Sequence, residues 1–511
     1  MEEITIFEFS LLGVYGLVIV LLVLFGLHKF FLLYLYWKHK NFPLQPQSKM
    51  GRLPKVTLQL PIYNEKYVVE RLLKSICELD YPKELLQIQV LDDSTDETCH
   101  LVGRLVQLYQ LQGFDIHYIH RENRAGYKAG ALDYGLSQAT GVFVGIFDAD
   151  FAPESDFLKR TLPYFSDSRV ALVQARWGHI NRDYSLLTRI QSLFLDGHFI
   201  IEHTARNRSG RFFNFNGTAG IWRKQAIIDA GGWQHDTITE DLDLSYRAQL
   251  RGWRFVYVPD LVAPAELPVE VNAYKSQQHR WAKGSVQTAK KLLPVIFKSK
   301  IPFFVKLEAT MHLVSNMTYL FMTIPSILMP IVLHVQLNHG WNWMVYVYLV
   351  VFLTASLSVV LYYLISQKES NCNWIEQIPY LPLLMSLGIG LSINNTKAVL
   401  EALFNHKSEF KRTPKYRIER ASDTWLQKSY RADFNVQPIV ELLLGCYFTI
   451  ASISLADRGL YVSIPFFLLF QFGFIYLGAT SLLQARRFSL NFVQLKFFFQ
   501  QRLLFMTKNL P

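Results

Sequence analysis

Val56-Thr-Leu-Gln-Leu60 and Gln87-Ile-Gln-Val-Leu91 are two short apolar runs, and a helical pattern that ends near Leu79 lies between them. The alternation continues with apolar runs at 115–119 and 142–147, which flank a helical pattern at 128–139. Strands that alternate with helices predict a doubly wound, mostly parallel α/β sheet. Ligands of such sheets bind beyond the carboxyl ends of the strands, so the residues that follow each run are candidate site residues.

Two acidic clusters follow predicted strands. Asp92-Asp93-Ser94 comes directly after the second run, where a turn or a helix N-cap would explain it equally well. Asp148-Ala149-Asp150 follows the run at 142–147, and these two carboxylates repel each other unless a cation neutralises them. Hard oxygen ligands suit Mg²⁺ or Mn²⁺ bound to a diphosphate, so this cluster predicts a metal site. The glycine-rich motifs of dinucleotide-binding and P-loop enzymes do not occur in the sequence.

The stretch Arg124-Ala-Gly-Tyr-Lys128-Ala-Gly lies between the two clusters. Gly126 and Gly130 permit close backbone approach, and Lys128 opens a predicted helix whose N-terminus favours anions. An ordinary junction between a loop and a helix explains the same residues, so both interpretations stay open at this point.

Two later stretches point to sugar binding and to acid–base chemistry. Residues 211–222 read Arg-Phe-Phe-Asn-Phe-Asn-Gly-Thr-Ala-Gly-Ile-Trp, and aromatic faces with amide side chains are typical of sugar-binding surfaces. Thr237-Ile-Thr-Glu240-Asp241 then enters a predicted helix, in which Thr237 and Glu240 fit a capping box. The box does not use Asp241, which is therefore a candidate general base.

Composition and apolar runs indicate a membrane protein. Half of the 511 residues are hydrophobic, and residues 9–27 carry no charge over a length that can cross a bilayer. The net charge of +11 comes from Lys and Arg beside apolar runs, which favours lipid headgroups over nucleic acid. Acidic residues precede the first run and basic residues follow it, so we expect the chain from about residue 40 to be cytosolic. Four scattered cysteines without metal spacing fit a reduced cytosolic face.

Further apolar runs at 310–333, 344–366, 439–455 and 460–483 predict five spans in all, with the N-terminus outside and the C-terminus inside. The run at 380–400 is interrupted by Asn394, Asn395 and Lys397, so we expect an interfacial helix there. The basic, aromatic tail at 485–511 predicts a helix that lies on the membrane surface. Gln277-Gln-His-Arg280-Trp281 precedes the run at 310–333, where interfacial Trp and Arg are also ordinary.

Taken together, these motifs resemble in order and spacing those of the processive, membrane-integrated family 2 glycosyltransferases. The likeness is greatest to the cellulose-synthase-like glucomannan (mannan) synthases. It implies a GT-A-like α/β cytosolic domain inserted between an N-terminal transmembrane helix and a C-terminal helical transmembrane region. The motifs are Leu91-Asp92-Asp93-Ser94-Thr95, Gly126-Tyr127-Lys128-Ala129-Gly130, Phe147-Asp148-Ala149-Asp150, Phe215-Asn216-Gly217-Thr218, Thr239-Glu240-Asp241 and Gln277-x-x-Arg280-Trp281.

The resemblance implies a role for each of these residues. Asp241 would be the catalytic base, with Glu240 beside it. Arg280 would steady the leaving diphosphate and Trp281 would stack on the acceptor sugar. Asp148 and Asp150 would hold Mg²⁺ or Mn²⁺. The nucleotide-sugar would be bound by Pro61, Tyr63, Glu65, Asp92, Asp93, Lys128, Asp148, Gln277 and Arg280, and the acceptor by Phe215, Asn216, Gly217, Thr218 and Trp281.

Phe410-Lys-Arg-Thr413-Pro-Lys415 resembles the gating-loop motif Phe-x-Val-Thr-x-Lys of cellulose synthases. Arg412 stands where that motif has valine, and a solvated run of charge explains the stretch equally well. Phe410, Thr413 and Lys415 are the candidate gating residues.

The expected organisation has an anchor, a cytosolic domain and a membrane region. The segments are an N-terminal anchor (1–40), the GT-A domain (50–265), interfacial helices (266–305), a transmembrane helix pair (306–368), an interfacial helix with the gating-like loop (376–435), a second transmembrane pair (436–484) and a basic tail (485–511).

The leading hypothesis is a processive inverting β-glycosyltransferase that polymerises a β-1,4-linked mannan, glucomannan or glucan and moves it across the membrane. GDP-mannose or UDP-glucose would be the donor, a growing glycan the acceptor, and an accessory export subunit a candidate partner. A ceramide-glucosyltransferase-like enzyme that adds one sugar to a lipid, and an inactive membrane scaffold, are the alternatives. We expect a multi-pass protein of a bacterial inner membrane, or of the Golgi if the source is eukaryotic.

Overall fold

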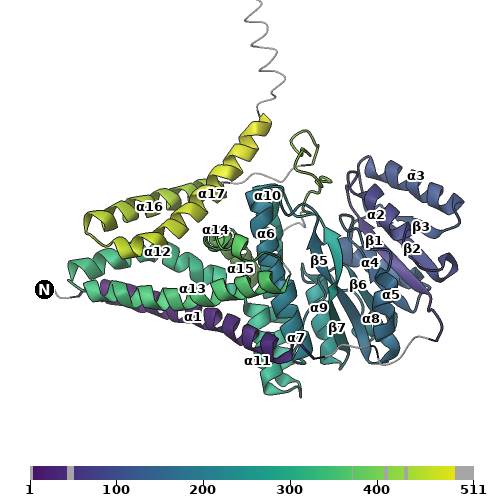
Figure 1. The fold of residues 1–511 in the computed structure, drawn as a ribbon, viewed down its shortest axis with the longest axis horizontal. Helices are drawn as coiled ribbons and strands as arrows, with labels where there is room; N and C mark the ends of the chain where they lie inside the picture. Colours follow the sequence, from purple (N-terminus) through teal and green to yellow (C-terminus); the bar gives the residue numbers. More distant parts are fainter. Residues whose placement is uncertain are drawn as a thin grey trace, which may run out of the picture.

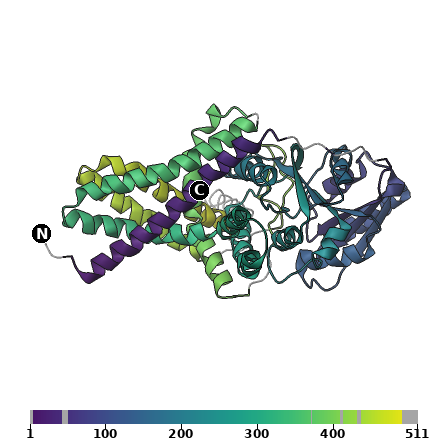
Figure 2. The same ribbon diagram turned by 90° about the horizontal axis from the view of Figure 1, so that it is seen from below.

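A sheet with helices on both faces lies at one end of the molecule and a bundle of long helices at the other (Figure 1). The computed structural model describes residues 4–42, 46, 51–370, 372–407, 412–430 and 436–489. Of residues 486–489 it describes the backbone but not the side chains. Figure 2 shows that α1 (Ile6–His39), in purple, runs along the bundle and ends beside the sheet domain. Between the two parts lie α6 (Leu186–Asp196), α7 (Thr204–Arg208), α10 (Val271–Lys298) and α11 (Phe303–Val314).

Within the described residues, one seven-stranded sheet has the order β3-β2-β1-β4-β6-β5-β7. Every neighbouring pair is parallel except those of β6, which is antiparallel to β4 and β5. The doubly wound, mostly parallel sheet is therefore confirmed, and β6 is a departure that strand–helix alternation did not reveal. The strands are β1 (Val56–Ile62), β2 (Leu86–Asp92), β3 (Asp115–His120), β4 (Phe143–Ile146), β5 (Val170–His179), β6 (Gly220–Arg223) and β7 (Arg254–Ala265).

Apolar side chains fix the helices to the two faces of the sheet. One core contains Leu58, Leu72 and Val102, and the other contains Leu132 and Trp222, all fully buried. Both faces are covered, so polar side chains can gather only at the ends of the strands. The helices of the first face are α2 (Val69–Cys77), α3 (Thr98–Leu111) and α5 (Phe157–Thr161), and those of the second are α4 (Tyr127–Gln138), α8 (Lys224–Asp229) and α9 (Glu240–Leu250).

Five helices among the described residues are long and apolar enough to cross a membrane, as predicted. The predicted start of the second span at residue 310 was wrong, because α11 ends at Val314 and a new helix begins at Met317. The predicted surface helix at 485–511 overlaps α17 up to Ser489 and otherwise lies outside the described residues. The five are α1, α12 (Met317–Asn338), α13 (Asn342–Glu369), α16 (Gln437–Asp457) and α17 (Ile464–Ser489).

The segment predicted as one interfacial helix at 380–400 forms two, α14 (Tyr380–Gly390) and α15 (Ser392–Leu403), bent by 41°. The bent pair could count as a sixth span. Asn394, which interrupts the apolar run, is buried and donates from Nδ2 to the backbone carbonyl of Lys275 in α10 (2.8 Å). The polar side chain of Asn394 therefore contacts another part of the protein and does not require a position at the membrane–water interface. The 3₁₀ helices among the described residues are η1 (Lys83–Leu85), η2 (Leu162–Ser166), η4 (Ile375–Gln377) and η5 (Tyr461–Ser463).

Two glycines let α14 and α17 approach until their backbones touch. A Cβ on Gly473 would lie 2.1 Å from the carbonyl oxygen of Ser386, and one on Gly390 would lie 2.5 Å from the carbonyl oxygen of Gly473. Close approach at small residues is a usual means of helix association in membranes. Gly388, on the same helix α14, has no atom within 4 Å of its added Cβ.

We predict that Gly473→Ala lowers the midpoint of thermal unfolding in detergent by several degrees, because overpacking typically costs about 1–3 kcal/mol. Gly388→Ala is the matched control and should leave the midpoint unchanged or raise it slightly. Equal midpoints for the two variants would contradict the close contact of α14 with α17.

Candidate active site

A cavity of about 230 Å³ opens at the carboxyl ends of β1, β2 and β4 and is closed by α9, α10 and the loop at 412–415. This is the edge of the sheet at which the sequence predicted a site. The predicted site residues that line it are Pro61, Tyr63, Glu65, Asp93, Lys128, Asp148, Asp150, Asn216, Gly217, Glu240, Asp241, Gln277, Arg280, Trp281, Thr413 and Lys415.

The carboxylates of Asp148 and Asp150 each form an ion pair with a lysine ammonium. Lys128 Nζ lies 2.5 Å from Asp148 Oδ1, and Lys415 Nζ lies 2.7 Å from Asp150 Oδ2. Burial raises the pKa of Asp148 above its usual value, and the charge of Lys128 opposes this shift. Two cations therefore already stand where the sequence predicted a divalent metal, and the donor set of two adjacent carboxylates fits such an ion.

Lys128 lies between the carboxylate pair Asp148–Asp150 and the candidate base Asp241. It opens α4 behind Gly126, whose φ of 70° lies in the left-handed region that favours glycine. Its Nζ also donates to the carbonyl oxygen of Gly217 (2.9 Å). A Cβ added to Gly217 would lie 3.0 Å from Asp241 Oδ2 and 3.5 Å from Lys128 Nζ, so this glycine admits the base and the lysine side by side.

Glu240 and Asp241 begin α9, and Asp241 Oδ1 accepts a hydrogen bond from the backbone amide of Leu242 (2.8 Å). The predicted capping box of Thr237 with Glu240 was wrong, because the helix starts at Glu240 itself and Thr239 is the N-cap residue, without a side-chain hydrogen bond. Glu240 is therefore in the first position of the helix, too early to reach back to a cap. Burial raises the pKa of Asp241 to about 7, with the neighbouring charge of Glu240 as the second cause. A carboxylate of that pKa suits general-base work near neutral pH.

Gln277, Arg280 and Trp281 lie on one face of α10, because residues three and four apart in a helix are neighbours. Arg280 Nη2 donates to Thr413 Oγ1 (2.9 Å). Burial lowers the pKa of Arg280 to about 10, opposed by the charges of Glu240 and Asp148. The guanidinium is still charged at neutral pH and faces the same cavity as the acidic residues.

The loop at 412–415 covers the cavity, so its charges are not a solvated run. Thr413 and Lys415 are buried, and Arg412 Nη1 lies 2.9 Å from Glu65 Oε1. Burial raises the pKa of Glu65 to about 7 and the charge of Arg412 opposes this. Arg412, which replaces the valine of the motif, thus has a defined carboxylate partner. Phe410 lies outside the described residues.

Two arginines that the sequence did not single out for a role lie near Asp93 and Tyr63, and of these Arg124 lines the cavity. Arg121 binds both oxygens of Asp93, at 2.7 Å from Nε and 2.5 Å from Nη2. The guanidinium of Arg124 lies over the ring of Tyr63 at 3.4 Å from its centroid. Arg124 begins the stretch Arg124–Gly130 that lies between the two acidic clusters, whereas Arg121 follows β3 and belongs to no recognisable sequence pattern.

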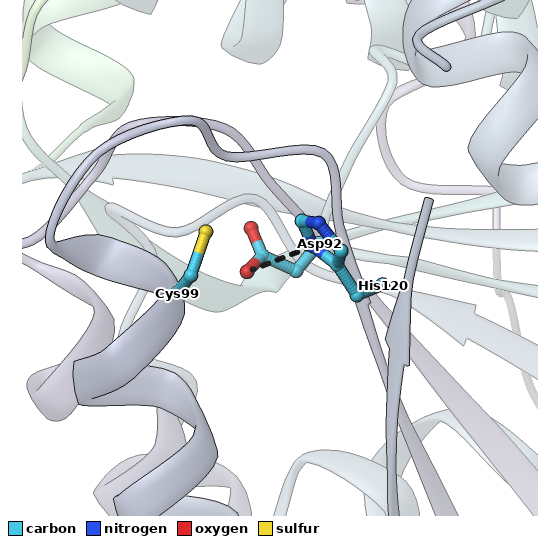
Figure 3. A group of neighbouring side chains, drawn as sticks. All are labelled: Asp92, Cys99 and His120. Atoms are coloured by element: carbon cyan, nitrogen blue, oxygen red, sulfur yellow. Dashed lines mark ion pairs between the residues drawn. The ribbon is translucent and has the colours of Figure 1, made fainter. Parts of the chain in front are cut away.

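Asp92 does not line the cavity. Figure 3 shows it between Cys99 and His120, and the ligand atoms of these three lie within 4.8 Å of one another. Both Asp92 oxygens already accept hydrogen bonds, Oδ1 from the amide of Ser94 and Oδ2 from the hydroxyl of Tyr118 (2.9 Å each). Asp92 therefore shapes the loop after β2, which is the turn-forming role that the sequence left open.

Two of the five predicted acceptor residues also lie behind the cavity wall. Phe215 is fully buried, edge-on to Trp222 with ring centroids 5.7 Å apart. Thr218 Oγ1 accepts a hydrogen bond from the amide of Asp148 (2.9 Å) and so fixes the loop that carries Asp148 and Asp150. Asn216 and Gly217 are the members of this motif that face the cavity.

A second cavity of about 350 Å³, which we call the inner chamber, shares Trp281, Asp241 and Asn216 with the first. It continues between α10 and the long helices. Charged and histidine side chains that the sequence reasoning missed line it, because they come from distant segments without a shared pattern. They are His28, Lys29, His198, Glu202, Arg206 and His312.

Residues 54–284 match the family model described as glycosyltransferase like family 2. These residues form a family 2 glycosyltransferase domain. Glucomannan 4-beta-mannosyltransferase 2 of Arabidopsis thaliana is 44% identical over 278 residues, which cover 52% of this chain and 52% of the relative. Glucomannan 4-beta-mannosyltransferase 9 of the same plant is 40% identical over 311 residues, 57% of this chain and 58% of the relative. The chain thus matches about half the length of these relatives.

The fold of the glycosyltransferase domain also occurs in a solved structure. A mannosyltransferase from Pyrobaculum calidifontis, in complex with GDP-Man and Mn²⁺, has a TM-score of 0.52 at 21% identity and covers 77% of this chain and 100% of that chain. The GT-A-like fold is confirmed, and so is the resemblance to the glucomannan synthases of family 2.

The raised pKa of Asp241 has a consequence for stability. A carboxyl group whose pKa is higher in the folded protein than in the unfolded chain contributes stability below the unfolded value, near 4, and loses it as the pH rises through the folded value, about 7. We predict that Asp241→Asn, in metal-free and nucleotide-free protein, unfolds at a higher temperature than the wild type at pH 8 and that this difference shrinks toward pH 5. Asp183→Asn, at an exposed carboxylate outside the cavity, is the control and should show no such trend. A difference that is constant from pH 5 to pH 8 would contradict the raised pKa.

Proposed function

We propose that the chain is a processive inverting β-glycosyltransferase that builds a β-1,4-linked mannan or glucomannan from a nucleotide-sugar. The observation that carries the proposal is the convergence of Asp241, the Asp148–Asp150 pair, Arg280 and Trp281 on one cavity of a family 2 domain. The names of the relatives, glucomannan 4-beta-mannosyltransferases, favour GDP-mannose over UDP-glucose as the donor.

The donor would lie along the carboxyl ends of the strands. Its base would meet Tyr63, Arg124 and Asp93, and its diphosphate would lie toward Asp148 and Lys128. Asp148 and Asp150 would hold a divalent cation, Mg²⁺ or Mn²⁺, in place of or beside their lysines, and the relative in complex with GDP-Man and Mn²⁺ supports this. Such an ion would neutralise negative charge on the departing diphosphate. Arg280 would add a fixed positive charge on the α10 side.

The acceptor would reach the donor from the inner chamber. Its terminal sugar would stack on Trp281, with its hydroxyl toward Asp241. Asp241 would take the proton of that hydroxyl, the hydroxyl oxygen would form the bond to the anomeric carbon, and the bond from that carbon to the diphosphate oxygen would break. Attack in line with the leaving group inverts the anomeric centre, so an α-linked donor gives a β-linked product.

Repeated transfer and export are part of the proposal. A third cavity, of about 360 Å³ among the long helices, has Phe25, Lys29, Phe194, Thr318, Tyr319 and Tyr363 in common with the inner chamber. This run of cavities supports a product that leaves between the protein's own helices. We propose, from the basic residues that follow the first apolar run, that the catalytic domain lies in the cytosol and that the first helix enters from outside. The membrane that we propose for this protein is a bacterial inner membrane, or a Golgi membrane if the source is eukaryotic.

We predict that Asp241→Asn lowers transfer by roughly 10²–10⁴-fold, because the general base is lost, while nucleotide affinity is retained. The measurement incubates purified protein in detergent with labelled GDP-mannose or UDP-glucose and Mn²⁺ and then sizes the product. A ladder of long products supports the polymerase, a single labelled lipid supports the ceramide-glucosyltransferase alternative, and no product supports the scaffold. Wild-type activity in the variant would refute the assigned base.

Asp148→Ala should act on metal and nucleotide rather than on proton transfer. We predict that it weakens Mn²⁺-dependent binding of GDP, measured by calorimetry, by about 100-fold, since loss of a residue that only supports a metal ligand already costs about 10–100-fold. Asp156→Ala, at a carboxylate of the same region that does not line the cavity, should bind GDP as the wild type does. Unchanged affinity of Asp148→Ala with Mn²⁺ present would count against the metal site.

A further inference from the structure

The far wall of the inner chamber carries an ionic network that no motif of the family 2 resemblance includes. Glu202 is its centre: Oε1 lies 2.6 Å from Lys29 Nζ, and Oε2 lies 3.0 Å from His198 Nδ1 and 3.2 Å from Arg206 Nη1. Burial favours the neutral acid, but Lys29 and Arg206 hold the pKa of Glu202 well below its usual value. Glu202 is therefore an ionised carboxylate beside the place proposed for the acceptor.

A π-helical segment, η3 (Gly197–His203), positions these side chains. Its wider turn places residues four and five apart on one face, so His198 has both Glu202 and His203 beside it, and the two imidazole centroids lie 4.3 Å apart. Gly197 permits this packing, since a Cβ there would lie 2.6 Å from the rings of Tyr362 and Tyr363.

A chain of hydrogen bonds fixes the histidine tautomers and ends at Asn216. His203 Nε2 donates to Asn216 Oδ1 (2.5 Å), and Asn216 Nδ2 donates to His198 Nε2 (3.1 Å). His198 Nε2 is then an acceptor, so its proton lies on Nδ1 and is donated to Glu202. Asn216 is thereby held next to Gly217, and both residues line the active-site cavity.

The network has a side that faces the chamber and a side that does not. The side chains of Lys29 and Glu202 are 28% and 12% accessible, whereas Glu308, which binds Arg206 Nε from behind (3.0 Å), is 1% accessible and does not line the chamber. Lys29 Nζ donates one described hydrogen bond, to Glu202, and lies 4.4 Å from the centroid of the Tyr362 ring, so an ammonium with three donors has one left for a ligand. Glu202 has three described partners, Lys29, His198 and Arg206, out of about four acceptor positions.

We propose that Lys29, His198 and Glu202 form an acceptor subsite that binds the hydroxyl groups of a sugar beyond the one stacked on Trp281. The proposal rests on the proposed glycosyltransferase function and deepens it. The cations Lys29 and Arg206 are balanced by Glu202 on the wall and by Glu308 behind it, so this network offers donors and acceptors while its charges cancel. That pattern suits a neutral hexose unit of an oligosaccharide better than the phosphate of a lipid.

The test compares how acceptor length affects KM. Methyl β-mannoside reaches only the Trp281 position, whereas β-1,4-mannotetraose extends along the chamber, so the wild type should show a lower KM for the tetrasaccharide. In Glu202→Gln and Lys29→Gln this advantage should fall by about tenfold or more, the usual effect of losing a hydrogen bond to a charged group. The KM for GDP-mannose should stay unchanged in both variants.

Glu308→Gln is the matched control, because it removes one carboxylate from the same network without touching the chamber. It should keep the wild-type advantage of the tetrasaccharide. If it loses that advantage as Glu202→Gln does, the network is only structural and the proposal is overturned. Should Glu202→Gln fail to fold, as judged by thermal unfolding and GDP binding, Lys29→Gln decides on its own.

The outcomes also separate this proposal from the function on which it rests. If the wild type transfers sugar and both chamber variants keep the full advantage of the tetrasaccharide, the subsite is wrong while the glycosyltransferase stands. If the wild type transfers nothing to either acceptor, the proposed function fails. Direct binding of mannotetraose, followed by calorimetry in the wild type and in Lys29→Gln, then decides the subsite: weaker binding in the variant supports it and equal binding overturns it.

Discussion

Repulsion among buried carboxylates is the constraint on which the rest of this structure depends. Glu65, Asp148, Asp150, Glu240 and Asp241 all face one cavity of about 230 Å³. Charges confined in so small a space are costly unless cations of the protein lie among them. Those cations come from three separate parts of the chain. Lys128 lies in the first turn of α4 and Arg280 belongs to α10, whereas Arg412 and Lys415 belong to the loop that follows α15.

This requirement explains why the sheet domain and the membrane region are built as one unit. The acidic residues follow strands or begin a helix of the sheet domain, but α10 packs against α15 and α17, and the loop at 412–415 follows α15. The proposed donor, with its diphosphate, would make the lysines on Asp148 and Asp150 rearrange or share their carboxylates. The loop is thus tied electrostatically to what the cavity contains.

The sequence predicted the parts of the site that depend on local rules. Asp148 and Asp150 could be found because parallel strands bring their carboxyl ends to one edge, and Gln277, Arg280 and Trp281 because helical spacing places them on one face. Rules of the same kind misassigned Glu240 to a capping box, since a shift of the helix start by a few residues changes which position Glu240 occupies. The antiparallel β6 was also missed, because strand–helix alternation does not report direction.

Other features could not be predicted because they join segments far apart in the chain. His28 and Glu308 are 280 positions apart, and Arg182 contacts Gln367, yet neither pair belongs to a periodic pattern. Arg121 and the π-helical turn at 197–203 depend on packing that no local propensity encodes. The fold class and the catalytic edge were thus accessible from sequence, whereas the inner chamber required the three-dimensional arrangement.

The first helix, α1, forms ion pairs and hydrogen bonds with several distant parts of the protein. Through Lys29 it neutralises Glu202, through His28 it contacts Glu308, and through Lys40 and Tyr36 it binds Glu369 of α13. A fragment that lacks residues 1–42 would therefore retain every motif of the glycosyltransferase domain, but Glu202 would lose Lys29 and Glu308 would lose His28, and both would depend on Arg206. Trimming the protein to its enzymatic portion would remove part of the wall along which its product is expected to pass.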